Sequence, residues 1–180
     1  MDLIKGNDSR LKEMCPEFKF DTGYIMEDGT VLQAKELYEL LRDKMIELKG
    51  VGLSACQLGI MTRVFVIGNP SDPASIIGVF NPIIVDYDEE TVVYEEGCVT
   101  YPGLFIKIKR PRAIRVRYRG WNGEADTTRY EGYTARVFQH EYDHLNGITF
   151  QSRANRYHLE QARNFKAKAD KRLENIKRTA

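Results

Sequence analysis

The sequence is poor in histidine, cysteine and tryptophan, with three, three and one of each among its 180 residues. Three cysteines cannot all pair, and a small disulfide framework needs more of them, so we expect free thiols or metal thiolates in a reducing compartment. No apolar run reaches the length of a signal peptide or of a membrane helix. These absences argue against a disulfide-rich secreted domain and a membrane-spanning protein, and they predict a soluble, unsecreted chain.

Two of the three histidines fall in a single motif. The stretch QHEYDH contains a complete H-E-x-x-H, formed by His140, Glu141 and His144. On a helix the two histidines lie one turn apart on the same face, so both imidazoles can reach one metal ion with Glu141 beside it. We expect this helix to begin with a cap at Thr134 and to end at Gly147. The motif also occurs by chance on solvated helices, so a third ligand is needed to support a metal site.

The local sequence does not supply that third ligand. A catalytic divalent ion usually takes three protein ligands and leaves one position for water. The run H-E-x-x-H-x-x-G opens like that of the metzincin proteases, but Phe150 stands where their third histidine should be. The ligand must come from elsewhere, and the residue types that can supply it leave five candidates: Cys98, Cys15, Cys56, His158 and Glu160.

The hydrophobic patterns predict the remaining elements. An extended arm is expected over residues 1–29, followed by a helix from a capping box at residues 30–33 to Lys49. A hairpin turn is expected at Trp121-Asn122-Gly123. Strands are predicted at residues 63–67, 78–80, 82–85, 91–94, 106–109, 114–119 and 127–130. The order predicts an α+β fold, with mixed or antiparallel sheets around a central helix that carries H-E-x-x-H.

Two segments between these elements have more than one interpretation. The glycine-spaced run from Gly50 to Gln57 is either a tight connection from helix to strand or a means of aiming the Gln57 amide at a substrate oxygen. It lacks the Lys-Ser/Thr that a phosphate-binding loop requires. Cys98 lies among turn residues, where it is either an inert thiol or a functional group.

Positive charge is concentrated in two places. Residues 104–119 contain seven Lys/Arg and no acid, and their alternation with apolar residues predicts half-buried strands with one basic face. This basic face is either simply hydrated or a contact surface for RNA or a peptide carboxylate. Residues 153–180 contain nine Lys/Arg and three Asp/Glu. They are predicted to form a basic C-terminal helix that packs on the single catalytic domain, residues 1–152. The packing surface is expected to be a narrow apolar stripe along the helix: Leu159, Ala162, Phe165, Ala169, Leu173 and Ile176.

Three segments taken together resemble the signature segments of peptide deformylases. They are GVGLSACQ at residues 50–57, EGCVT at residues 96–100 and QHEYDHL at residues 139–145. The resemblance covers about residues 30–150 and implies a peptide deformylase-like catalytic domain over residues 1–152. It implies Cys98, His140 and His144 as metal ligands, Glu141 as general acid and base, and Gln57 with the Val99 backbone N–H as oxyanion hole.

The resemblance also implies the reaction: hydrolytic removal of the formyl group from the N-terminal formyl-methionine of new polypeptides, with release of formate. It implies one Fe²⁺ per chain, with Zn²⁺, Ni²⁺ or Co²⁺ as substitutes. We expect a monomer in the cytoplasm of a bacterium or of a phage-infected host, with a tail helix that contacts the ribosome. The expected substrate-binding residues fall into two groups. The backbones of Val51, Gly52 and Gly97 are expected to pair with the peptide, and the side chains of Val51, Val137 and Phe138 are expected to form the methionine pocket.

The chain departs from the usual family pattern at a few positions. Ser54 replaces the usual alanine, Val99-Thr100 replaces Leu-Ser, and Phe105 stands where some members carry a substrate-contacting arginine. A divergent member of the family is therefore expected. Two other functions stay open from the residues themselves: a zinc peptidase that uses His140, His144 and Glu160, and an RNA-binding module built around a structural metal.

Overall fold

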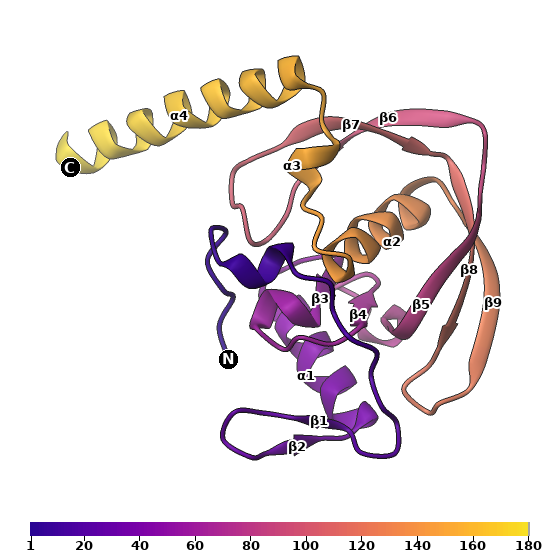
Figure 1. Ribbon diagram of the computed structural model, residues 1–180. Helices are drawn as coiled ribbons and strands as arrows, with labels where there is room; N and C mark the ends of the chain where they lie inside the picture. The colour runs from indigo at the N-terminus through magenta and orange to yellow at the C-terminus, as the bar shows by residue number, and fades with distance from the viewer. Residues whose placement is uncertain (180) are drawn as a thin grey trace.

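Antiparallel strands and α-helices make up the fold (Figure 1). The computed structural model describes residues 1–179. The strands are β1 (Tyr24–Ile25), β2 (Val31–Leu32), β3 (Gly52–Ser54), β4 (Val64–Ile67), β5 (Ile77–Tyr87), β6 (Thr91–Glu96), β7 (Ile106–Pro111), β8 (Ala113–Arg119) and β9 (Ala125–Glu131). The helices are α1 (Ala34–Glu47), α2 (Gly132–Leu145), α3 (Phe150–Arg153) and α4 (Arg156–Thr179), with 3₁₀ helices η1 (Ser9–Lys12), η2 (Ala55–Leu58) and η3 (Pro73–Ser75).

A five-stranded antiparallel sheet in the order β3-β4-β5-β8-β9 is covered by a helix on each face. In β4, Val64 and Val66 pack with α1, whereas Phe65 and Ile67 pack with α2. Successive side chains of a strand point to opposite faces, so all four are buried because each face has its own helix. The predicted α+β architecture with antiparallel sheets is confirmed, and the pairs β1-β2 and β6-β7 form two smaller sheets.

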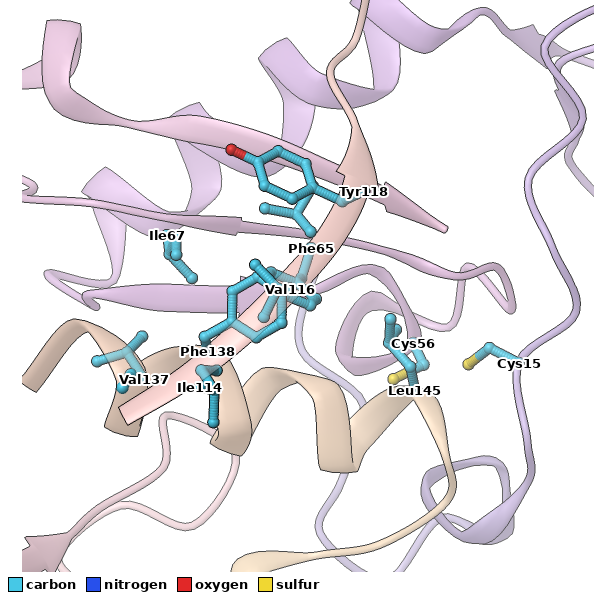
Figure 2. Close-up of a cluster of buried hydrophobic side chains, with 12 residues drawn as sticks. Cys15, Cys56, Phe65, Ile67, Ile114, Val116, Tyr118, Val137, Phe138 and Leu145 are labelled. Carbon is cyan, nitrogen blue, oxygen red and sulfur yellow. The ribbon is translucent and has the colours of Figure 1, made fainter. Parts of the chain in front are cut away.

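Helix α2 is held on the sheet by its apolar face (Figure 2). Phe138 packs edge-on against Phe65 of β4, with ring centroids 5.0 Å apart, in a cluster that includes Val116 of β8. Burying a phenylalanine side chain in such a cluster contributes about 1.5–3 kcal/mol. Residues that follow Phe138 by two and by six positions lie on the other side of the helix. The anchoring of Phe138 therefore fixes the direction in which His140 and His144 point.

The helix starts differ from the predicted ones. The capping box of α1 is made by Gln33 and Glu36, whose carboxylate accepts a hydrogen bond from the Gln33 backbone N–H at 2.8 Å. The predicted capping box spans residues 30–33. Its two central residues, Val31 and Leu32, instead form β2, because they pair with Ile25 and Tyr24 of β1. Helix α2 begins at Gly132 rather than at Thr134, since β9 runs directly into it. Its end agrees with the prediction, with Gly147 at φ 69°.

The N-terminal arm runs along the body and is tied to it by backbone hydrogen bonds. The N–H of Ile4 donates to the carbonyl of Gln57, and the N–H of Cys15 donates to that of Leu145, each at 2.9 Å. The arm therefore holds together two segments that also reach the candidate site. Among the described residues, no helix combines the length and the apolar character needed to cross a membrane.

Helix α4 packs on the body only at its start, which corrects the prediction that its whole apolar stripe is docked. Leu159 and Ala162 pack against a small cluster around β7 and α3. Farther along, Phe165, Leu173 and Ile176 are 75%, 58% and 55% exposed. Figure 1 shows why: α4 leaves the body beside β7 and extends away from the sheets.

Candidate active site

Three segments that are distant in the sequence meet beside α2. The loop after β6 carries Cys98, α2 carries His140 and His144, and β3 leads into η2 next to them. The metal-binding atoms of these three side chains all lie within 4.8 Å of one another. The Sγ atom of Cys98 is 3.4 Å from Nε2 of His144. The structure therefore brings one sulfur together with the two imidazoles of the H-E-x-x-H motif.

A buried carboxylate orients the first imidazole. Nδ1 of His140 lies 3.0 Å from Oε2 of Glu96, and both side chains are less than a tenth exposed. Burial raises the pKa of Glu96, but hydrogen bonds from His140 and Arg110 and the charge of Arg110 outweigh it, so the net pKa is well below the usual range. An ionised carboxylate only accepts hydrogen bonds, so Nδ1 carries the proton and Nε2 is left for a metal.

The pKa of the second imidazole shifts downwards. Burial holds the pKa of His144 well below its ordinary value, and the positive charges of His140 and Arg110 lower it further. A neutral imidazole is the form that binds metals. Within the described part of the chain, Nδ1 of His144 is a buried polar atom without a hydrogen-bond partner. No other side chain therefore fixes its tautomer as Glu96 fixes that of His140.

The surroundings also favour a positive charge at the centre of the cluster. Burial lowers the pKa of His140, but its hydrogen bonds with Cys98 and Glu96 outweigh burial and raise it to about 10. The protein thus stabilises one cationic charge between a thiol and a carboxylate. A divalent ion bound to sulfur and imidazole nitrogen supplies such a charge, and this ligand set suits several transition metals. The residues present therefore fit a metal ion.

The other candidate ligands lie away from this cluster. Cys15 and Cys56 belong to the buried core that Figure 2 shows, near Leu145. Glu160 is on α4, where its carboxylate accepts a hydrogen bond from Arg156 at 3.0 Å. His158 is also on α4. The group of metal-binding side chains found among the described residues includes neither of them, so the peptidase alternative loses its third ligand.

Glu141 lies buried between α2 and β3. Its Oε2 atom accepts a hydrogen bond from the Ser54 hydroxyl at 2.7 Å. Burial raises the pKa of this carboxyl, which the charge of His140 and the Ser54 hydrogen bond oppose. A Cβ atom at Gly52 would meet Oε1 of Glu141 at 2.6 Å. The glycine spacing of this segment therefore has a specific cause: only glycine lets β3 pass so close to the Glu141 carboxylate.

The side chain of Gln57 is fixed at both ends of its amide. Its Oε1 accepts a hydrogen bond from the Ser54 backbone N–H at 2.8 Å. Its Nε2 donates to Thr100 Oγ1 at 3.0 Å and contacts Cys98 Sγ at 3.4 Å. The Gln57 amide nitrogen therefore lies beside Cys98.

A cavity of about 390 Å³ opens above the cluster. It is lined by Gln57, Cys98, Val99, His140 and Glu141. Of the predicted substrate-binding residues, those that also line it are Val51, Gly52, Gly97 and Val137. The sequence interpretation missed other lining residues, among them Tyr101, Leu104, Tyr133 and Arg136. Arg136 could have been predicted from the sequence, because it precedes His140 by four residues and therefore lies on the same face of the helix.

Phe138 is not part of this cavity, which corrects its predicted place in the methionine pocket. It is fully buried in the core and packs against Phe65 and Tyr130. Adjacent helical residues point about 100° apart, so Val137 can face the cavity while Phe138 faces the sheet. Phe105, by contrast, lines the cavity with its ring against Gly97, whose added Cβ would lie 2.7 Å from the ring.

Beneath the histidines lies a network of buried charges. Arg110 donates to Glu96 at 2.7 Å and to Asp143 at 2.6 Å, and Arg136 donates to Glu96 at 2.8 Å. Arg153 donates to the other side of Asp143, also at 2.6 Å. The network connects β6, β7, α2 and α3 directly below the candidate site. The predicted alternation of β7 is confirmed, since Lys107 and Lys109 are exposed, and Arg110 lies on the opposite, buried face of the strand.

Comparison with known proteins assigns this arrangement to a family. A family model described as polypeptide deformylase matches residues 2–160. The chain belongs to the polypeptide deformylase family. The peptide deformylase of Thermotoga maritima is 45% identical over 114 residues, which are 63% of this chain and 68% of the relative.

Solved structures of the family have the same fold. The peptide deformylase of Plasmodium falciparum superposes with a TM-score of 0.80 at 26% identity, over 97% of this chain and 98% of that one. The Acinetobacter baumannii peptide deformylase with Met-Ala-Ser bound superposes with a TM-score of 0.73 at 29% identity, over 85% and 97%. Deformylation of newly made peptides is therefore the function of this chain, and the enzyme is a hydrolase.

The ionic network predicts a dependence of stability on Glu96. Glu96→Gln removes the carboxylate that pairs with buried Arg136 and leaves buried Arg110 with Asp143 alone, so we expect the free energy of unfolding at pH 7 to fall by about 3–5 kcal/mol. The Glu96 pKa is lower in the folded protein than its ordinary value of 4.5, so its contribution is present above pH 4.5 and is lost as pH falls below it. Urea unfolding between pH 7 and pH 3 should show a flatter acid dependence for the variant.

The matched control is Glu90→Gln. Glu90 pairs with Arg112 at the surface, with both side chains more than half exposed. Such a pair contributes about 0–1 kcal/mol, so this variant should unfold almost like the parent. Equal destabilisation by the two substitutions would contradict the importance of the network.

Proposed function

We propose that Cys98, His140 and His144 hold one divalent metal ion, Fe²⁺ in the native enzyme with Zn²⁺, Ni²⁺ or Co²⁺ as substitutes, and that the enzyme removes the formyl group from formyl-methionyl peptides. The observation that carries the proposal is the approach of these three side chains to within 4.8 Å beside the buried carboxyl of Glu141. When bound, such an ion polarises the formyl oxygen and lowers the pKa of water, which makes hydrolysis fast near neutral pH.

Glu141 holds and moves the proton. It accepts a proton from the attacking water and delivers it to the leaving amine, so that formate and a free N-terminus are the products. Burial raises its pKa towards the operating range of the enzyme, which suits a group that must both take up and release a proton. The Ser54 hydroxyl holds Oε2, while Oε1 lies beside Gly52 at the wall of the cavity.

The Gln57 amide and the Val99 backbone N–H stabilise the negative charge that develops on the formyl oxygen. Hydrogen bonds to Ser54 and Thr100 hold the Gln57 amide in place before substrate arrives. Preorganised donors of this kind act without rearrangement, and loss of one typically costs about 10²–10³ in rate. Both residues line the cavity above Cys98.

The start of the substrate peptide occupies the 390 Å³ cavity. Val51 and Val137 supply apolar contacts for the methionine side chain, and the backbones of Val51, Gly52 and Gly97 pair with the peptide as an added strand. The Met-Ala-Ser bound to the Acinetobacter relative supports this class of substrate. Recognition through the backbone reads few side chains after the first, which suits an enzyme that acts on many different new polypeptides.

The first test measures formate released from formyl-Met-Ala-Ser by protein purified without oxygen and loaded with Fe²⁺. The parent should release formate, and Glu141→Ala should lower kcat by at least about 10²-fold because the proton carrier is lost. Retained activity in Glu141→Ala would remove Glu141 from the mechanism. A parent that binds metal but releases no formate would contradict the proposed function.

The metal ligands are tested by metal content. Cys98→Ser should lower bound metal per chain to a small fraction of the parent value, because a neutral hydroxyl replaces a thiolate ligand. Glu160→Gln is the control, since that side chain is a ligand only in the peptidase alternative. Inductively coupled plasma mass spectrometry after dialysis gives the stoichiometry. Metal lost in Glu160→Gln but kept in Cys98→Ser would reverse the assignment.

Ser54 is tested as a residue that positions Glu141. Ser54→Ala removes one hydrogen bond from the Glu141 carboxylate, and we expect kcat to fall about 2- to 10-fold, as befits a bond that contributes about 0.5–1.5 kcal/mol. KM should stay unchanged because Ser54 is fully buried and does not line the cavity. In a Glu141→Ala background the same substitution should have no further effect on the residual rate.

We also propose that the enzyme works as a monomer in the cytoplasm and that α4 contacts ribosomal RNA. The charge reversals Lys171→Glu, Arg172→Glu and Lys177→Glu on α4 should weaken co-sedimentation with ribosomes and reduce its dependence on salt, because each lost phosphate contact lowers the slope by about 0.7–0.9. Reversal of three lysines elsewhere provides the control: Lys12, Lys19 and Lys35. Equal binding by both triple variants would contradict a role for α4.

A further inference from the structure

A second hollow, of about 650 Å³, lies between α4 and the edge of the β6-β7 sheet. Phe105 and Lys107 line it from the sheet side, and Phe165 and Lys168 line it from α4. We call it the α4 groove. It exists because α4 packs on the body at Ala162 and then leaves it.

The α4 groove is continuous with the active-site cavity. Glu95, Gly103 and Phe105 line both hollows. The ring of Phe105 rests on Gly97, the residue before Cys98, and is 58% exposed. A chain that leaves the cavity over Gly97 therefore passes the Phe105 ring and enters the α4 groove.

The chemistry of the α4 groove suits an extended peptide with aromatic and acidic side chains. Phe105 and Phe165 expose 58% and 75% of their surface and present apolar faces from opposite walls. Lys107 and Lys168 add positive charge, and Lys166 lies beside Gly103 but is paired with Asp170. The acidic residue of the lining, Glu95, stands opposite Lys107 across the β6-β7 pair and offsets its charge. Lys168 therefore supplies the positive charge that a bound chain can use.

We infer that the α4 groove binds the part of the substrate polypeptide that follows its first three residues, with a preference for aromatic and acidic side chains. The inference rests on the proposed function for the identity of the chain. The substrate is a polypeptide whose remainder must leave the cavity, and an extended chain advances about 3.3 Å per residue, so a few more residues reach the neighbouring hollow. Continuity with the cavity favours this occupant over an unrelated protein.

The test compares peptides that differ only beyond the third residue. Formyl-Met-Ala-Ser is measured beside two ten-residue peptides that begin with the same three residues and continue with a Phe/Glu-rich or a Phe/Lys-rich segment. We expect kcat/KM of the parent to rise about 5- to 10-fold for the Phe/Glu peptide over the tripeptide. Lys168→Glu should reverse the order of kcat/KM for the two long peptides. Phe165→Ala should bring kcat/KM for both long peptides close to the value for the tripeptide.

Variants farther along α4 provide the matched controls. Leu173 is an exposed apolar residue of the same helix that does not line the groove, and Arg178 is an exposed basic one. Leu173→Ala and Arg178→Glu should therefore keep the parental preference. Equal kcat/KM for all three peptides, or equal losses in the control variants, would overturn the inference.

A binding measurement keeps this inference separate from the proposed function. Fluorescence anisotropy with a labelled, unformylated Met-Ala-Ser-Phe/Glu peptide needs no turnover. The parent should bind it about 5- to 10-fold more tightly than the Phe165→Ala, Lys168→Glu double variant does. If the tripeptide is not hydrolysed but the parent still binds the labelled peptide more tightly than the double variant, the proposed function is wrong and peptide binding in the α4 groove is supported. Equal affinities would overturn the groove even in an active enzyme.

Discussion

The site depends on the burial of one carboxylate, that of Glu96, among cationic partners. A carboxylate taken out of water is costly unless its partners surround it, and here two arginines and one imidazole do so. Because Arg110 also bonds Asp143 of α2, the same network fixes the H-E-x-x-H helix relative to β6 and β7. The loop that carries Cys98 begins directly after Glu96, so the network sets the position of the thiol relative to both histidines.

Around this network the chain uses close approaches that leave little freedom. Gly52 lets β3 pass the Glu141 carboxylate, and Ser54 from the same strand holds that carboxylate by a hydrogen bond. The next residue, Ala55, begins η2, which brings Gln57 beside Cys98. The GVGLSACQ segment therefore contributes its backbone, a positioning hydroxyl and an amide donor within one short stretch. Such a site is preorganised, which is what hydrolysis by oriented polar groups requires.

Helix α4 shows how a local pattern can be right about structure and incomplete about packing. Its stripe of apolar residues correctly predicted a helix, but periodicity does not tell how far a neighbouring surface extends. Leu159 and Ala162 pack on the body, and Phe165 instead forms one wall of an open groove. Likewise, alternation correctly predicted a strand with Lys107 and Lys109 on its exposed face, but it gave no reason for the buried position of Arg110. Acids from β6 and α2, distant in the sequence, make burial of that arginine favourable.

The sequence by itself determined the residues that can do chemistry here. The spacing of His140 and His144 placed them on one helical face, and three signature segments indicated the family, its α+β fold and the thiol at Cys98. Only the tertiary structure showed that Cys98 lies beside both histidines, separated Val137 in the cavity from Phe138 in the core, and revealed Glu96 as the partner of His140. The physical reason is that residue type and helical or strand period are local properties. Burial, ion pairing and the approach of two backbones depend on segments that meet only when the chain has folded.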